Sequence, residues 1–277
     1  MPAPPLLPFG MLASTRHGDV TRLHMSTATS RAIGYSVSAF VLRDVLIDTG
    51  FPAVAREVAA WLDENRPRAA ILTHHHEDHA GNAALIAGAG IPIAAADATI
   101  AALRAGEPIG LYRRIIWGTP TVLPADARFD ALVDSGLRLV ATPGHSDDHH
   151  VVWDDETGTL FAGDLFLSVK VRLAHPGESP RTLVASLRRA AALEPARMFD
   201  AHRGPVPEPA AALRAKADWI EETIAAVEAS LDAGLSDRAI ARRVLGREPA
   251  EHYVSRGKMS KINFVRAVRR ERSERRG

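Results

Sequence analysis

The sequence predicts an α/β protein in which two β-sheets form a sandwich, helices cover both outer faces, and a small helical region follows at the C-terminal end. Three observations support this fold class. Strand-like and helix-like patterns alternate along residues 20–200, and they fall into two strand-rich halves that each carry helices. Beyond residue 208 the patterns are helical throughout.

The composition of the chain is that of a globular protein. It has 277 residues, of which 46% are hydrophobic and 24% charged, so one large domain with an accessory piece is expected. No apolar run approaches the roughly 18 to 20 residues that a membrane span requires. The opening MPAPPLLPFGML is interrupted by proline and lacks the basic start of a signal peptide. We therefore expect a cytoplasmic protein that makes no membrane contact, and the sequence indicates nothing about its oligomeric state.

The first half is expected to begin with three short strands. Runs rich in apolar and β-branched residues predict them at 20–24, 35–42 and 45–48, with a turn at Arg43–Asp44 between the last two. Apolar residues at helical spacing then predict a helix over 53–64.

The alternation continues with two further strands, at 69–73 and 91–95, and two helices, at 83–89 and 98–103. The pattern dissolves over 104–119, a segment that forms either a cap over a site, with Tyr112 and Trp117 as walls, or ordinary packing, which we favour.

The second half is predicted to contain strands at 137–142, 151–153, 160–163 and 197–200, with a helix over 182–193 before the last of them. After the sequence GPVP the character changes: helical patterns occur at 210–231, from Ser236 to Gly246 and from Ser260 onward. We therefore divide the chain into a catalytic domain, 1–207, and a C-terminal helical accessory domain, 208–277.

Positive charge gathers at the C-terminal end. The segment from Arg256 to Arg276 holds nine Lys or Arg residues and two Glu, although the whole chain has a net charge of only +1. Such a segment either contacts nucleic acid or forms a solvated helix face, and the second is more common. Phe264 is its one aromatic residue, which weakens a single-strand binding role because base stacking normally uses several.

The stretch THHHEDHAGN, Thr73 to Asn82, crowds titratable side chains just after a predicted buried strand. The chain has no cysteine, so a zinc-like ion would be held by His, Asp or Glu. On an extended segment His74 and His76 point to one side and His75 to the other. Asp78 and His79 precede Gly81, where the chain turns back, so they can face a second ion.

Three distant residues also follow predicted strand ends, where side chains converge on one rim of an α/β fold. His145 lies in the turn TPGHSDDH, Asp164 follows the strand at 160–163, and His202 follows the strand at 197–200.

Taken in order, these residues resemble the metallo-β-lactamase superfamily over about residues 18–206. The resemblance implies an αβ/βα four-layer sandwich with two divalent metal ions at one edge, zinc by preference and iron or manganese as alternatives. The implied ligands of one ion are His74, His76 and His145, those of the other are Asp78, His79 and His202, and Asp164 bridges the two. Asp48, at the end of an early strand, would orient one of the ligands.

The mechanism that this resemblance implies uses a metal-bridging hydroxide as the nucleophile. Asp164 would hold the two ions together, and Asp78 would orient the hydroxide. In true metallo-β-lactamases the bridging position is not aspartate, so antibiotic hydrolysis is disfavoured. THHHEDHAGN resembles the metal loop of glyoxalase II, and TPGHSDDH resembles a group of β-lactamase-like proteins that includes an endoribonuclease.

Three hypotheses about function follow. The first is hydrolysis of a small-molecule ester, thioester or lactone. The second is a nuclease acting on RNA or another phosphodiester, with the basic C-terminal segment as its nucleic-acid contact. The third is a metal-binding or redox module without hydrolysis. The other histidines are expected to stay outside the ligand set: His75, His149 and His150 as structural or orienting groups, and His17, His24, His175 and His252 as ordinary surface or core residues.

Overall fold

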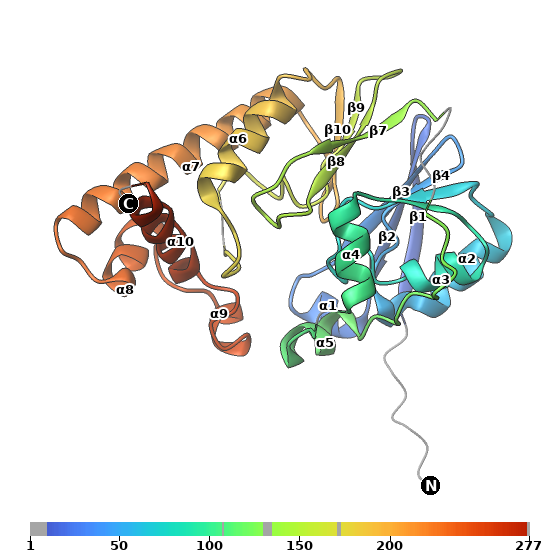
Figure 1. Ribbon diagram of the computed structural model, residues 1–277, viewed down its shortest axis with the longest axis horizontal. Helices are drawn as coiled ribbons and strands as arrows, with labels where there is room; N and C mark the ends of the chain where they lie inside the picture. The colour runs from blue at the N-terminus through green and yellow to red at the C-terminus, as the bar shows by residue number, and fades with distance from the viewer. Residues whose placement is uncertain (1–9, 107, 130–134, 171–172, 276–277) are drawn as a thin grey trace, which may run out of the picture.

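The computed structural model describes residues 10–106, 108–129, 135–170 and 173–275, and its two mixed β-sheets face each other inside a shell of helices (Figure 1). The first sheet has six strands in sequence order: β1 (Met11–His17), β2 (Val20–Ser26), β3 (Val37–Leu42), β4 (Val45–Ile47), β5 (Ala69–Ile71) and β6 (Ile93–Ala94). The first four are antiparallel neighbours, whereas β5 and β6 run parallel to β4.

The second sheet has five strands in the order β11-β10-β9-β8-β7. They are β7 (Leu137–Ala141), β8 (His150–Asp154), β9 (Thr159–Phe161), β10 (Arg197–Asp200) and β11 (Gly204–Val206). β9 and β10 are parallel, and the other neighbouring pairs are antiparallel.

Side chains alternate between the two faces of each sheet, as the period of two requires. In β8 Val152 points into the space between the sheets, whereas Val151 and Trp153 face the outer helices. Three phenylalanines meet between the sheets with ring centroids 5.4 to 5.6 Å apart: Phe40, Phe161 and Phe199. The centre of this inner layer is apolar, and the side chains of the candidate metal centre lie in the loops beyond the strand ends.

Helices cover both outer faces (Figure 1). Those of the first half are α1 (Ala28–Ala32), the 3-10 turn η1 (Pro52–Val54), α2 (Ala55–Glu64), α3 (Ala83–Gly88), α4 (Asp97–Ala105) and α5 (Leu111–Trp117). On the far side of the second sheet α6 (Pro180–Ala191) packs along α7 (Pro209–Asp232). The arrangement confirms the predicted fold class.

The C-terminal region continues from α7 through α8 (Asp237–Ile240), the π-helical turn η2 (Ala241–Leu245), α9 (Ala250–Val254) and α10 (Lys261–Glu274). Ser236 and Ser260 cap α8 and α10 as their sequence positions predict. Phe264 of α10 and Leu213 of α7 belong to the same hydrophobic cluster as Leu160 of the second sheet. The C-terminal helices thus share a core with the second half, and the domain boundary at 207/208 stays a prediction.

β1 and α5 are among the elements that the sequence did not predict. β1 was not predicted because MLASTRH is mostly exposed and has no apolar alternation to mark it. The segment 104–119 was expected to be irregular but contains the helix α5. Its Ile116 and Trp117 are buried, and Trp117 packs on Phe51 with ring centroids 4.8 Å apart.

None of the helices in the described ranges is both long and apolar enough to cross a membrane.

Candidate metal centre

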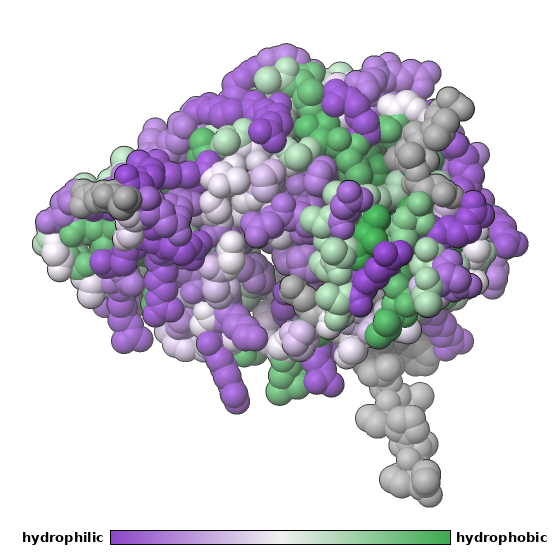
Figure 2. All heavy atoms as spheres, in the orientation of Figure 1, coloured by the Kyte–Doolittle hydropathy of each residue, from purple (hydrophilic) through white to green (hydrophobic). Residues whose placement is uncertain are grey.

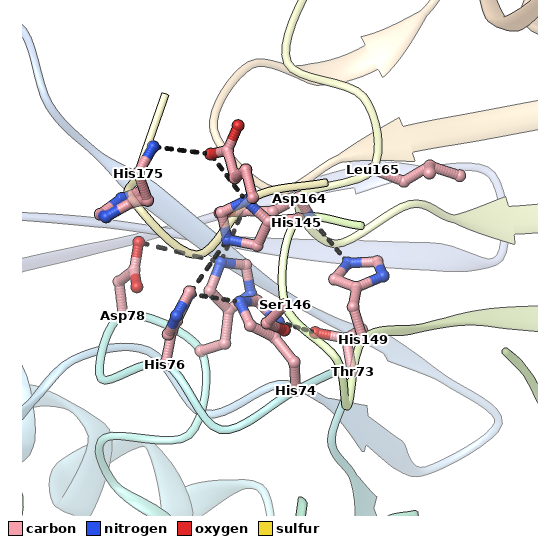
Figure 3. A network of polar contacts seen from close by, with 12 residues as sticks. Thr73, His74, His76, Asp78, His145, Ser146, His149, Asp164, Leu165 and His175 are labelled. Atoms are coloured by element: carbon pink, nitrogen blue, oxygen red, sulfur yellow. Dashed lines mark hydrogen bonds and ion pairs between the residues drawn. The ribbon is translucent and has the colours of Figure 1, made fainter. Parts of the chain in front are cut away.

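The predicted ligands converge at one edge of the sandwich, where loops from both sheets meet (Figure 3). The loop after β5 carries His74 to His79, and three loops of the second sheet, those after β7, β9 and β10, carry the rest. All seven residues expected from the sequence fall into two overlapping groups. One contains His74, His76, His145 and Asp164, and the other contains Asp78, His79, Asp164 and His202.

In the first group three imidazole nitrogens lie close together. Nε2 of His74 and Nε2 of His145 are each 3.0 Å from Nδ1 of His76. Oδ2 of Asp164 is 3.2 Å from Nε2 of His145.

In the second group Asp164 Oδ1 is 3.1 Å from Nε2 of both His79 and His202. Oδ2 of Asp78 lies 3.8 Å from the same nitrogen of His79 and 3.7 Å from that of His202. The two oxygens of the Asp164 carboxylate therefore belong to different groups.

These distances fit metal coordination. Four donors about 2.0 to 2.1 Å from a tetrahedral zinc ion lie about 3.3 Å from one another, close to the separations observed here. His79 gives a further sign, because its buried Nε2 makes no well-directed hydrogen bond within the described residues, although Asp164 Oδ1 lies 3.1 Å away. A buried polar atom without a partner is costly, and a bound cation would satisfy it.

Neighbouring groups fix the imidazole rings. Asp48 Oδ2 lies 2.8 Å from Nδ1 of His79, and the carboxylate also accepts from the backbone N–H of Thr73. His202 Nδ1 is 2.7 Å from the backbone oxygen of Ser36. In each case the far nitrogen, Nε2, is left to face Asp164.

Gly81 fits the tight loop for a reason that the sequence did not indicate. Its φ is not in the left-handed region. Instead, a Cβ there would come within 2.1 Å of the backbone oxygen of Glu77 and 2.4 Å of Pro52 Cδ. The glycine allows two backbone segments to approach closely, which brings Asp78 and His79 back toward the strand ends.

Two histidines outside the ligand groups hold the metal loops. His75 points away from the centre, as alternation predicts, and its Nδ1 lies 2.8 Å from Oδ1 of Asp148. Asp148 also accepts from the backbone N–H of His75, so it ties the loop after β5 to the loop after β7. His149 Nε2 accepts from the backbone N–H of Asp164.

His175, which the sequence analysis did not single out, lies next to the candidate ligands. Its ring lies beside the ligand group, with centroids 5.9 Å from His76 and 6.0 Å from His145, and it lines the pocket above them (Figure 3). Glu178 accepts from the backbone N–H of His175 and lies 3.5 Å from Nδ1 of His145. Both residues come from an irregular segment before α6, where no periodicity marks them.

Burial and charge set the protonation of the centre. Burial, reinforced by neighbouring imidazoles, holds the pKa of His74 and of His76 well below the usual histidine range. Both imidazoles are therefore neutral and can each offer a nitrogen lone pair to a metal ion. Burial alone would lower the pKa of His202, but Asp164 and Asp78 raise it to about 9. Burial would likewise raise the pKa of Asp164, yet the surrounding histidines keep it well below its usual range. The carboxylate is therefore ionised, as a ligand must be.

A pocket of about 280 Å³ opens over the two groups, and one of its walls comes from the C-terminal region. Lys216 of α7 lines it, with 3% of its surface exposed, and donates from Nζ to the backbone oxygen of Leu165 at 2.8 Å. In the part of the chain that the structure describes, no carboxylate lies within ion-pair distance of this ammonium. Burial lowers the pKa of Lys216 to about 8.

Comparison with known proteins places this centre in a family. Residues 33–202 match the model of the metallo-beta-lactamase superfamily. This match covers more than half of the chain, so the protein belongs to the metallo-β-lactamase superfamily. Its candidate metal ligands are the two groups described above.

The individual relatives are similar to this chain over only part of its length. The beta-lactamase-like protein 2 homolog of Caenorhabditis elegans is 27% identical over 203 residues, which are 66% of this chain and 63% of that protein. The hydroxyacylglutathione hydrolase of Hahella chejuensis is 32% identical over 124 residues, 42% of this chain and 41% of that one. The chain thus spans less than two thirds of the length of either relative.

Among solved structures, a metallo-beta-lactamase from Pontibacter korlensis is similar to this chain with a TM-score of 0.58 and 18% identity. The match covers 76% of this chain and 99% of that one. At this identity the likeness supports the fold alone.

Proposed function

We propose that the protein is a dinuclear hydrolase of a small ester, thioester or lactone. The observation that carries the proposal is the position of Asp164, whose two carboxylate oxygens face two different groups of imidazole nitrogens. Such sharing is what a pair of ions a few ångströms apart requires. One ion alone would leave half of the buried donors without a partner.

The residues define which ions would fit. His74, His76 and His145 would hold one ion, Asp78, His79 and His202 the other, and Asp164 would contact both. A donor set of imidazole and carboxylate without thiolate suits zinc first, with iron and manganese as alternatives. When bound, two such ions activate a water molecule as a nucleophile and polarise the oxygen of the attacked carbonyl.

The side chains of the pocket have roles of their own. Asp78 lines the pocket, and its carboxylate can accept a hydrogen bond from the attacking water and hold it in position. His175 and the aromatic ring of Tyr112 border the same space, where they limit its size and exclude water. A pocket of about 280 Å³ admits the reacting part of a small molecule directly over the carboxylates.

A thioester is the preferred member of the class. The name of the Hahella chejuensis relative, hydroxyacylglutathione hydrolase, denotes a hydrolase of an acylated thiol, and its matched region is 32% identical. The pocket also offers a buried cation, Lys216, that can bind an anionic or carbonyl group of the thiol portion.

The arrangement of the basic C-terminal segment argues against nucleic acid as the substrate. Arg269 forms an ion pair with Asp237 at 2.6 Å, and Arg275 forms one with Glu228 at 2.6 Å. Arg272 pairs with Asp232. These three ion pairs attach α10 to α7 and α8, and they neutralise three of the nine positive charges of the segment that phosphate binding would use.

The proposal is tested by metal analysis of the purified protein together with a turnover panel. The panel contains a thioester, a lactone, a phosphodiester and a labelled single-stranded RNA. We expect about two equivalents of metal and hydrolysis of the thioester or lactone. Cleavage confined to the phosphodiester or RNA would overturn the proposal in favour of a nuclease, and iron without turnover of any compound would favour a redox or binding role.

A further inference from the structure

Large apolar side chains gather on one surface of the molecule. The described residues expose seven of them, and five line a single groove: Ile33, Leu111, Ile115, Val122 and Val254. The most exposed, Val122, Leu111 and Val254, are 72%, 67% and 64% accessible. A contiguous exposed apolar surface of this kind marks a binding site more often than chance.

The groove runs between α5 and the segment that follows it on one side, and α9 with its following turn on the other. It encloses about 1070 Å³. Apolar residues are visible at the tip of α5 in Figure 2, next to the hollow below the centre of the view. The side chain of Lys258 reaches across to the start of α5. A Cβ added to Gly110 would lie 2.8 Å from Nζ of Lys258.

The inner end of the groove is the metal pocket. His76, one of the candidate ligands, borders both spaces, and so do Tyr112, His175 and Met259. A ligand in the groove can therefore extend without a break to the carboxylates of the centre. This continuity favours the substrate itself as the occupant over a second copy of the chain or a flat lipid surface.

The helix α5 is built with two apolar faces. Ile116 and Trp117 point into the core, whereas Leu111 and Ile115, one helical turn apart, point into the groove. A surface helix normally carries polar residues on its outer face. Leu111 and Ile115 therefore gain free energy only when an apolar ligand covers them.

Charge on the groove is positive. Arg114, Arg256 and Lys258 line it, and its one acidic residue among those described, Glu77, is paired with Arg113. The groove therefore suits a chain of methylene groups that is attached to a polar or anionic remainder.

We propose that this groove binds the aliphatic acyl chain of the substrate, so the substrate class narrows to esters or thioesters of longer-chain fatty acids. The inference rests on the proposed function. The reaction is plain hydrolysis: the oxygen of water bonds to the acyl carbon, the carbon–sulfur or carbon–oxygen bond breaks, and the leaving atom takes up a proton. The products are a carboxylic acid and a thiol or alcohol.

The test is a series of thioesters that share one thiol and differ in acyl length from acetyl to dodecanoyl. For the unmodified protein we expect kcat/KM to rise by about two- to fourfold for each methylene that enters the groove, mainly through KM. In Leu111→Ser and Ile115→Ser this dependence should flatten, while turnover of the acetyl compound is kept. Met11→Ser is the matched control, because Met11 is 41% exposed on β1 away from the groove.

The outcomes separate the two proposals. Hydrolysis at every length with equal kcat/KM would overturn the acyl groove and leave the hydrolase standing. No hydrolysis at any length, of these thioesters or of the matching esters and lactones, would overturn the proposed function. Calorimetry of dodecanoate binding gives a readout that needs no turnover, and we expect about tenfold weaker binding in the two groove variants than in Met11→Ser. A dimer that dissociates in those variants, with unchanged dodecanoate binding, would show that the groove is instead a self-association surface.

Discussion

Nδ1 of His79 lies 2.8 Å from Oδ2 of Asp48, and the opposite nitrogen of the same ring faces Asp164. The Asp48 carboxylate fixes the ring in one orientation and makes it a better donor to a metal. Asp48 does so from a left-handed backbone conformation, with φ of +59°, which aspartate and asparagine tolerate better than most residues.

Asp48→Asn should therefore lower metal affinity without disturbing the backbone. We expect one of the two ions to bind about 10- to 100-fold more weakly, measured by competition with a chromophoric chelator. Asp44→Asn is the matched control, since Asp44 also has a positive φ, of +60°, but is exposed in the turn between β3 and β4. Equal metal affinity in both variants would show that the Asp48 contact does not support a ligand.

Asp164 and His202 should differ in how many ions they retain. Asp164 faces both ligand groups, whereas His202 belongs to one. Asp164→Asn should weaken the binding of both ions, and His202→Gln should leave one ion bound tightly. Metal content after dialysis against a weak chelator distinguishes these cases. The retention of two ions by Asp164→Asn would refute its role as a shared ligand.

Lys216 predicts a pH dependence of stability. Burial lowers its pKa from 10.5 to about 8, so below pH 8 it is charged in both the folded and the unfolded chain, and the folded state bears the full penalty. Between pH 8 and about 10.5 the folded protein releases this proton first, and the penalty disappears. The difference between the pKa of Lys216 in the unfolded chain and that in the folded protein corresponds to about 3 kcal/mol of unfolding free energy.

The unfolding free energy of Lys216→Met minus that of the unmodified protein should thus fall by about 2 to 3 kcal/mol from pH 7 to pH 10. Urea unfolding at both pH values measures it. The same substitution at the exposed Lys170 is the control for the loss of a lysine side chain. A pH-independent difference for Lys216→Met would mean that its ammonium is not desolvated.

Phe264 tests how far the C-terminal helices are part of the catalytic domain. It is 2% exposed and packs in one cluster with residues of the second sheet. Phe264→Ala should destabilise the protein by about 3 to 5 kcal/mol and shift a single unfolding transition. The control Tyr253→Ala, at a position that is 72% exposed, should change stability by less than about 0.5 kcal/mol. Two separate transitions would instead support an independent accessory domain.

Local patterns carried much of the fold prediction. The strands β3, β4 and β9 are short apolar runs bounded by turns, and the side chains at their ends lie at one edge because topology places them there. The residues of the histidine loop could be anticipated for the same reason, since their spacing and the strand before them are both local.

Other features depend on contacts between distant segments, and the sequence does not mark them. Asp148 binds His75 across 73 positions, and Glu178 reaches His145 from an irregular loop. In the sequence, Lys216 is one more polar residue of a long amphipathic helix. Only the packing of α7 places it in the pocket. The groove on α5 escaped prediction because its helix was taken as irregular.

Each ligand group takes two members from the loop after β5 and two from loops of the second sheet. An ion held there would cross-link the two halves of the molecule. Because ligand binding to the folded state alone adds about 2.7 kcal/mol per site at a hundredfold excess over Kd, heat resistance should follow the free metal concentration. The supply of metal would then govern the lifetime of the folded chain as well as its catalysis.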